Sequence, residues 1–224
     1  KSSRLLRRQS RIHSGSLFFA DHVPNRDAPV VERLRRAGAV ILGKATLHEL
    51  AFGSRSTNPV IGQCHNPWHP GRIPGGSSGG SGAAVAAGFC QAALGTDTGG
   101  SIRLPSAMNG VAGLRPTFGR VPNTGCMPVS AAHDTIGPMA HDVTDLALLL
   151  AVIAGPDGED PTCVAGPLGN FLPRLNDGVE ALRIGIPRNY YFEAVEPEIG
   201  DAVMAAARVF EGLGAQLVDV HVPG

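Results

Sequence analysis

The chain has 224 residues, 43% of them hydrophobic and 17% charged, which is long and apolar enough for a buried core and excludes a disordered chain. Its 19 basic and 19 acidic residues cancel, so the composition indicates neither a nucleic-acid-binding nor a membrane-binding protein. The cysteines are scattered without a Cys-x-x-Cys pair, so no zinc site is expected and a reduced, cytoplasmic environment is predicted. The longest apolar run, 146–154, is too short to cross a bilayer.

The N-terminal segment differs in composition from the rest of the chain. Residues 1–13 contain Lys1 and several arginines but no acidic residue, which is typical of a solvated basic tail. No apolar stretch with a cleavage site follows it, so no signal peptide is expected. We therefore separate a divergent basic segment, 1–14, from a folded domain over 15–224.

The first helix of that domain is predicted over 28–38. Asp27 is its expected N-cap, Pro29 falls in its first turn and Gly38 follows as a stop signal. A short buried strand is predicted next, over 39–42. It is followed by a second predicted helix over 47–52, capped by Thr46, and by a long loop over 54–74.

The remainder continues to alternate strands with helices. Helices are predicted over 81–88, from Ser101 onward, over 143–154 and over 197–212. Strands are predicted over 90–94, 182–186 and 216–220, and a linker is predicted over 155–181. Such alternation predicts the α/β class with a mixed or mostly parallel sheet.

Two glycine-rich turns that end on serines are the most informative part of the sequence. The first contains Gly75-Gly76-Ser77-Ser78-Gly79, and the second contains Asp97-Thr98-Gly99-Gly100-Ser101. Glycine lets a backbone turn sharply and approach a ligand closely, so such turns can place hydroxyls and N–H donors around one point. Acyl transfer needs a nucleophile, a proton carrier and an oxyanion hole, which these groups could supply.

Together the two turns resemble the amidase signature family, whose members cleave carboxamide bonds with a Ser–cis-Ser–Lys triad. The resemblance extends over residues 15–220, through the segments 26–44, 66–68 and 134–139. It implies the amidase-signature α/β fold, with a mixed, mostly parallel sheet surrounded by helices. The family's catalytic domain is longer, so the chain is expected to be its N-terminal part.

The resemblance also implies a role for each site residue. Ser101 is the nucleophile, and Ser77, after a cis peptide bond, relays its proton to a lysine. The backbone N–H groups of Thr98, Gly99, Gly100 and Ser101 form the oxyanion hole. Asp97 and Arg103 brace the second turn and Ser78 supports the first. No metal or cofactor is implied.

The catalytic lysine is the part of the resemblance that fits least well. Counting back from Ser77 places it near the N-terminus, so Lys1 is the candidate, although the expected preceding strand is missing and Ser2 replaces the following acid. Lys44 matches a different position of the family.

Several alternatives remain open. Gly75–Gly79 also fits the Gly-x-Ser-x-Gly nucleophile elbow, but no apolar strand precedes it, and no phosphate-binding loop sequence is present. A truncated remnant without turnover is a further reading. The expected partner is a small-molecule amide, with a homodimer as an open possibility and no membrane. Nucleic acid would enter only within an amidotransferase complex that uses glutamine.

Overall fold

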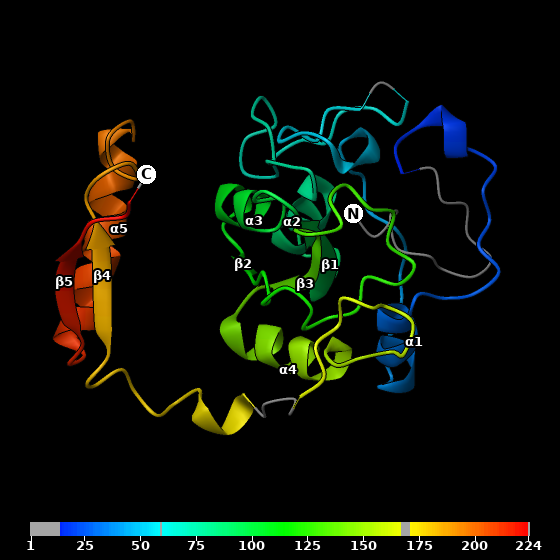
Figure 1. Ribbon diagram of the computed structural model, residues 1–224. Helices are drawn as coiled ribbons and strands as arrows, with labels where there is room; N and C mark the ends of the chain where they lie inside the picture. The colour runs from blue at the N-terminus through cyan, green and yellow to red at the C-terminus, as the bar shows by residue number, and fades with distance from the viewer. Residues whose placement is uncertain (1–13, 59, 167–170, 224) are drawn as a thin grey trace. The chain divides into compact units, whose positions relative to one another are not determined.

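The computed structural model describes residues 14–58, 60–166 and 171–223, so Lys1 and the basic segment 1–13 lie outside the described residues (Figure 1). The chain forms two compact units, Lys1–Leu172 and Pro173–Gly224, which are described separately below. In the described ranges, every helix falls short of the length and apolar character that a membrane span requires.

The first unit is organised around a three-stranded antiparallel sheet. Its strands are β1 (Ala92–Asp97), β2 (Ala112–Gly113) and β3 (Thr135–Ala140), in the order β1-β3-β2. The register places Ala92 opposite Ala140 and Asp97 opposite Thr135. All six residues of β3 are buried, so β3 is the centre of the sheet and β1 leads directly to the second glycine-rich turn.

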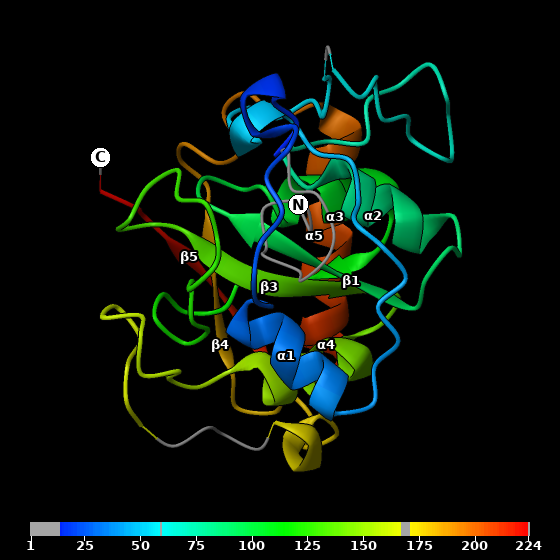
Figure 2. The same ribbon diagram turned by 90° about the vertical axis from the view of Figure 1, so that its right-hand side faces the viewer.

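Helices cover both faces of this sheet (Figures 1 and 2). On one face lie α2 (Gly79–Ala86) and α3 (Arg103–Asn109), and on the other lies α4 (Val143–Ile153), with α1 (Pro29–Arg36) beside it. The apolar core joins α1, α4 and the sheet through Val30, Leu34, Leu94, Ile136, Leu150 and Ile153. Both serine turns immediately precede helices of the α2/α3 face.

Short helical turns complete this unit. They are the 3-10 helices η2 (Leu17–Phe19) and η3 (Glu49–Ala51), with η4 (Leu172–Arg174) at the boundary between the units. The helix predicted over 47–52 is therefore wrong in extent: only η3 forms, because Leu50 takes the non-helical φ of 50°. The predicted cap Thr46 precedes His48, which is the observed N-cap.

Two further local predictions near α1 are wrong. Ala28, not Asp27, is the N-cap of α1, and Asp27 Oδ2 instead accepts a hydrogen bond from Arg35 Nε at 2.8 Å. No strand forms over 39–42, where Ile41 packs against the core but Val40 and Leu42 are exposed. The apolar run indicated burial, but only one of its faces meets the core.

The second unit is a single βαβ element. Its strands β4 (Arg183–Pro187) and β5 (Gln216–Val220) pair in parallel around the crossover helix α5 (Pro197–Gly212). These are the elements predicted from the sequence, and the α/β class is confirmed. Among the described strands, parallel pairing is confined to β4–β5, since β1–β3 and β2–β3 are antiparallel.

Candidate active site

Ser77 lies in the turn that enters α2, and its side chain is fully buried. The peptide bond between Gly76 and Ser77 is cis, as the sequence analysis predicts. The Ser77 carbonyl accepts hydrogen bonds from the His48 N–H at 3.2 Å and from Ser56 Oγ at 3.4 Å. Ser77 Oγ, in contrast, has no hydrogen-bond partner among the described residues. The backbone of Ser77 is therefore fixed while its hydroxyl is uncommitted.

Ser101 lies between the end of β1 and the start of α3, and it is half-buried. A backbone hydrogen bond from the Ser78 N–H to the Ser101 carbonyl, at 3.3 Å, joins the two serine turns directly. Ser78 Oγ donates to the Thr96 carbonyl of β1 at 3.2 Å. Ser78 thus attaches the first turn both to the second turn and to the strand that leads into it.

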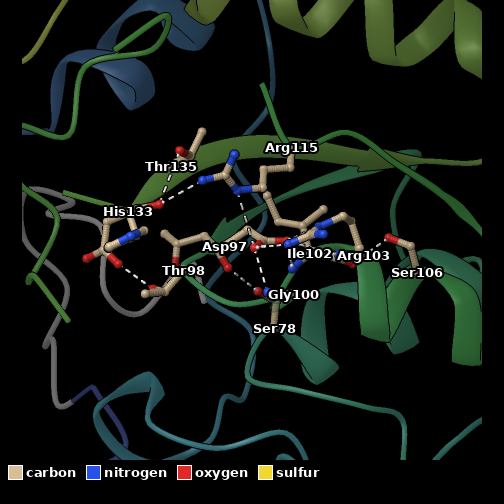
Figure 3. Close-up of polar contacts among 12 residues, drawn as sticks. Ser78, Asp97, Thr98, Gly100, Ile102, Arg103, Ser106, Arg115, His133 and Thr135 are labelled. Atoms are coloured by element: carbon tan, nitrogen blue, oxygen red, sulfur yellow. Dashed lines mark hydrogen bonds and ion pairs between the residues drawn. The ribbon is translucent and has the colours of Figure 1, made fainter. Parts of the chain in front are cut away.

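Asp97 is the centre of the polar network beneath the second turn (Figure 3). Its side chain is fully buried and accepts from the N–H groups of Gly100 at 2.7 Å, Ile102 at 3.0 Å and Arg103 at 3.3 Å. The Arg103 guanidinium adds two hydrogen bonds of 3.1 Å, one to each carboxylate oxygen. Arg115 approaches from another direction, with Nε 3.5 Å from Asp97 Oδ1.

These contacts keep Asp97 ionised despite its burial. Burial alone would raise the pKa of Asp97, but the Arg103 side chain and the N–H groups of Ile102, Gly100 and Arg103 together lower it below its ordinary value. The side-chain hydrogen bond between Arg103 and Asp97 also raises the pKa of Arg103. A charged carboxylate with this many donors fixes the shape of the turn that carries Ser101.

The network changes the predicted set of oxyanion donors. The Gly100 N–H donates to Asp97, so it is already engaged. Within the described part of the chain, no hydrogen-bond partner is found for the N–H groups of Thr98, Gly99 and Ser101. The Thr98 hydroxyl donates to Asp134, whose other carboxylate oxygen accepts from the Val129 N–H at 2.7 Å. Asp97 and Asp134 thus hold the loop from two sides, while the N–H groups of three of its residues remain available to bind an oxyanion.

At least two hollows lie in the described part of the first unit. The larger, of about 980 Å³, is lined by apolar residues of α1, α2 and β1 and by residues 39–46, which include Lys44. The smaller, of about 310 Å³, is bordered by Asn123, Cys126 and Asp134. Because Asp134 binds the Thr98 hydroxyl, the smaller hollow adjoins the second turn.

The structure therefore brings together most of the predicted site. Ser77, Ser78, Asp97, Arg103 and Ser101 meet through the contacts above, whereas Lys1 lies outside the described residues. Among the described residues, no group of three His, Cys, Asp or Glu side chains could hold a metal ion.

Three residues that contact the two turns are not among the predicted site residues. They are Arg115, Ser56 and Asp134. Asp134 begins the 134–139 segment of the resemblance, and Arg115 lies in the Gly-Leu-Arg-Pro segment, 113–116, that follows the second turn. Ser56 lies in the loop predicted over 54–74 and carries no local signal.

An α/β sheet that presents two joined glycine–serine turns, with a buried aspartate beneath the second, is the arrangement expected of an amidase-signature domain. The family model described as Amidase matches residues 8–224, and the chain belongs to this family. The predicted boundary after residue 14 is not tested by this match.

Similar proteins include the A subunit of glutamyl-tRNA(Gln) amidotransferase from Anaeromyxobacter sp. (strain K), 48% identical over 94% of this chain and 43% of the relative, and its counterpart from Chloroflexus aurantiacus, 49% identical over the same shares. The chain thus spans less than half the length of these curated relatives.

Solved structures show the same similarity. The corresponding glutamyl-tRNA(Gln) amidotransferase protein from Thermotoga maritima has a TM-score of 0.95 and 37% identity, over 99% of this chain and 49% of that one. The native peptide amidase from Stenotrophomonas maltophilia has a TM-score of 0.89 and 37% identity, over 99% and 47%. These structures confirm the amidase-signature fold, and this chain covers about half the length of each of them.

Proposed function

We propose that this chain carries the serine pair of an amidase that hydrolyses a carboxamide C–N bond through an acyl-enzyme. The observation that carries the proposal is the 3.3 Å bond that joins the Ser78 N–H to the Ser101 carbonyl, beside a buried Ser77 hydroxyl without a partner among the described residues. This geometry fits a nucleophile in one turn and a proton relay in the other.

In the proposed reaction, Ser101 Oγ attacks the carbonyl carbon and its proton passes to Ser77 Oγ, whose own proton passes to a general base. The amine leaves with a proton returned along the same route, and water then releases the acid from Ser101. The negative oxygen of each tetrahedral intermediate is stabilised by the N–H groups of Thr98, Gly99 and Ser101. Asp97 and Arg103 hold that loop in shape, and the Gly100 N–H contributes by donating a hydrogen bond to Asp97.

Lys1 is the proposed general base. Lys1 and Lys44 are its lysines, and Lys44 belongs to the wall of the larger hollow. The base must be neutral to accept a proton, which requires an environment that lowers the lysine pKa.

A second candidate function is the use of glutamine as the amide, in an amidotransferase with partner subunits and tRNA. The observation that favours it is the identity of 46–49% to relatives named as the A subunit of glutamyl-tRNA(Gln) amidotransferase. A third is a remnant without turnover, which is consistent with a chain that spans less than half of those relatives.

The test is covalent labelling with a fluorophosphonate, which reacts with activated serine hydroxyls, followed by mapping of the adduct by mass spectrometry. We expect the adduct on Ser101, its loss in Ser101→Ala, and labelling at least about 100-fold slower in Ser77→Ala. Ser130 is the internal control, because its Oγ lies 2.9 Å from His133 Nδ1 but outside both turns. An adduct on Ser130 or Ser77, with Ser101 unmodified, contradicts the proposal.

Ammonia release separates the candidate functions. Release from simple amides that disappears in Ser101→Ala supports the amidase, whereas release from glutamine alone supports the amidotransferase role. Labelling of Ser101 without any release supports the remnant.

A further inference from the structure

We infer that Ser56 is a positioning residue that fixes the backbone of the first serine turn, so that the Ser77 hydroxyl is held for proton transfer. The inference rests on the proposed function for its chemical meaning, but the contacts that carry it are independent of the reaction. Ser56 lies in the loop that follows η3 and is distant in sequence from the turn that it binds.

The Ser56 hydroxyl bonds the backbone of Ser77, which the proposed mechanism uses, and the backbone of Gly79. Ser56 Oγ accepts a hydrogen bond from the Gly79 N–H at 3.0 Å, and it donates to the Ser77 carbonyl at 3.4 Å. The shorter bond lies within the usual range and the longer one is weak. Because one contact falls on each side of Ser78, a single hydroxyl fixes the turn from Ser77 to the first residue of α2.

Close packing makes this contact specific to the residues present. A Cβ at Gly79 would lie 2.3 Å from Ser56 Oγ, and a Cβ at Gly76 would lie 2.9 Å from the Ser56 backbone nitrogen. Side-chain carbons essentially never approach other atoms so closely. The turn therefore presses against the loop that carries Ser56, and glycine at 76 and 79 is what allows this.

The Ser56 backbone itself is in an uncommon conformation. Its φ is 53°, in the left-handed region that residues other than glycine rarely adopt, and its side chain is fully buried. Such residues persist where the surroundings fix them, and they gather at functional sites. Here that conformation directs the hydroxyl toward Gly79 and Ser77.

The proposed role of Ser56 follows from the difference between the Ser77 carbonyl, which is hydrogen-bonded, and the Ser77 hydroxyl, which within the described ranges is not. The Ser77 carbonyl is held by Ser56 and by the His48 N–H, while Ser77 Oγ has no partner among the described residues. A relay needs this combination of a fixed backbone and an uncommitted hydroxyl. A displacement of about 1 Å at such a group can reduce a rate about 100-fold.

The first test measures the turn directly, by amide hydrogen exchange of peptides that cover 74–80. Ser56→Gly removes the hydroxyl but suits the left-handed φ, so it should fold, and Ser56→Ala removes the hydroxyl without that relief. We expect exchange in this segment to be at least about ten-fold faster in both variants. Ser106→Ala is the matched control, since Ser106 is also buried but bonds the Ile102 carbonyl of its own helical segment at 2.8 Å.

The second test is the rate of fluorophosphonate labelling of Ser101 across pH. Loss of positioning should slow labelling about ten- to 100-fold in Ser56→Gly, with melting temperature close to that of the unsubstituted chain. Unchanged exchange over 74–80 in both Ser56 variants overturns the inference. If Ser101 of the unsubstituted chain does not react at all, the proposed function fails, while the exchange result still decides the role of Ser56.

Discussion

Asp97 is bound by three backbone N–H groups and by Arg103, and none of its side chain is exposed, so its negative charge is part of the turn. Asp97→Asn replaces one acceptor oxygen with an NH₂ group that faces donors. We expect the free energy of unfolding to fall by about 2 kcal/mol, the usual scale for a hydrogen bond to a charged group. Urea unfolding measures the change.

The matched control is Glu32→Gln, which removes an exposed i,i+4 ion pair with Arg36 and should cost less than about 0.5 kcal/mol. Equal losses in the two variants would show that Asp97 does not brace the second turn.

The pH dependence of stability follows from the same carboxylate. The pKa of Asp97 is lowered in the folded protein, where hydrogen bonds outweigh the opposing effect of burial. Its stabilisation is therefore complete above the unfolded pKa of about 3.9 and is lost as pH falls through the folded value. We expect the stability difference between the unsubstituted chain and Asp97→Asn to shrink below about pH 4.

Acid unfolding followed by circular dichroism tests this difference. Asp157 and Asp160 also have lowered pKa values, because nearby donors outweigh burial, but they titrate in both proteins and cancel in the comparison. A difference that is constant from neutral pH to strongly acidic pH would be inconsistent with an ionised Asp97 bound by its donors.

Residues inside the two serine turns could be predicted from the sequence because each turn is a local string. Arg115, Ser56 and Asp134 could not be, since their contacts to Asp97, Gly79 and Thr98 depend on the three-dimensional fold. The motif identifies Gly100 as a candidate oxyanion donor, but it does not indicate that Asp97 accepts the hydrogen bond of the Gly100 N–H.

At the scale of elements, α4 begins at a side-chain cap, since Asp142 Oδ1 accepts from the Asp145 N–H at 2.9 Å. The helix contributes Leu146, Leu150 and Ile153 to the buried core. Asp142→Ala should lower the free energy of unfolding by about 1 kcal/mol, whereas Asp142→Ser should retain most of it. Thermal unfolding compares the two, and an alanine variant as stable as the serine variant would contradict the cap.

Elements with strong local signals can be predicted well, as α4, α5, β4 and β5 show. The central strand β3 belongs to a segment of the resemblance but is not predicted as a strand, because Gly137 and Pro138 argue against one. Its Gly137 lies opposite Gly95 of β1 in a fully buried strand, so packing of the sheet overrides the local preference.

At the scale of the whole molecule, exposed apolar surface is the property with the clearest consequence. Helix α5 exposes Ile199, Val203 and Val209, and Leu213 follows at its C-cap, each exposed by about half or more. Apolar side chains exposed along one helix favour association. We expect the purified chain to show an apparent mass that rises with concentration in light scattering.

Substitutions on α5 make this expectation specific. The double variant Ile199→Lys and Val209→Glu should lower the apparent mass toward that of a monomer, because charges oppose the burial of that face. Glu211→Lys on the same helix is the control, since it changes charge without removing an apolar side chain. A discrete dimer that persists in the double variant would place the association elsewhere on the chain, and a monodisperse monomer at all concentrations would show that this surface does not associate.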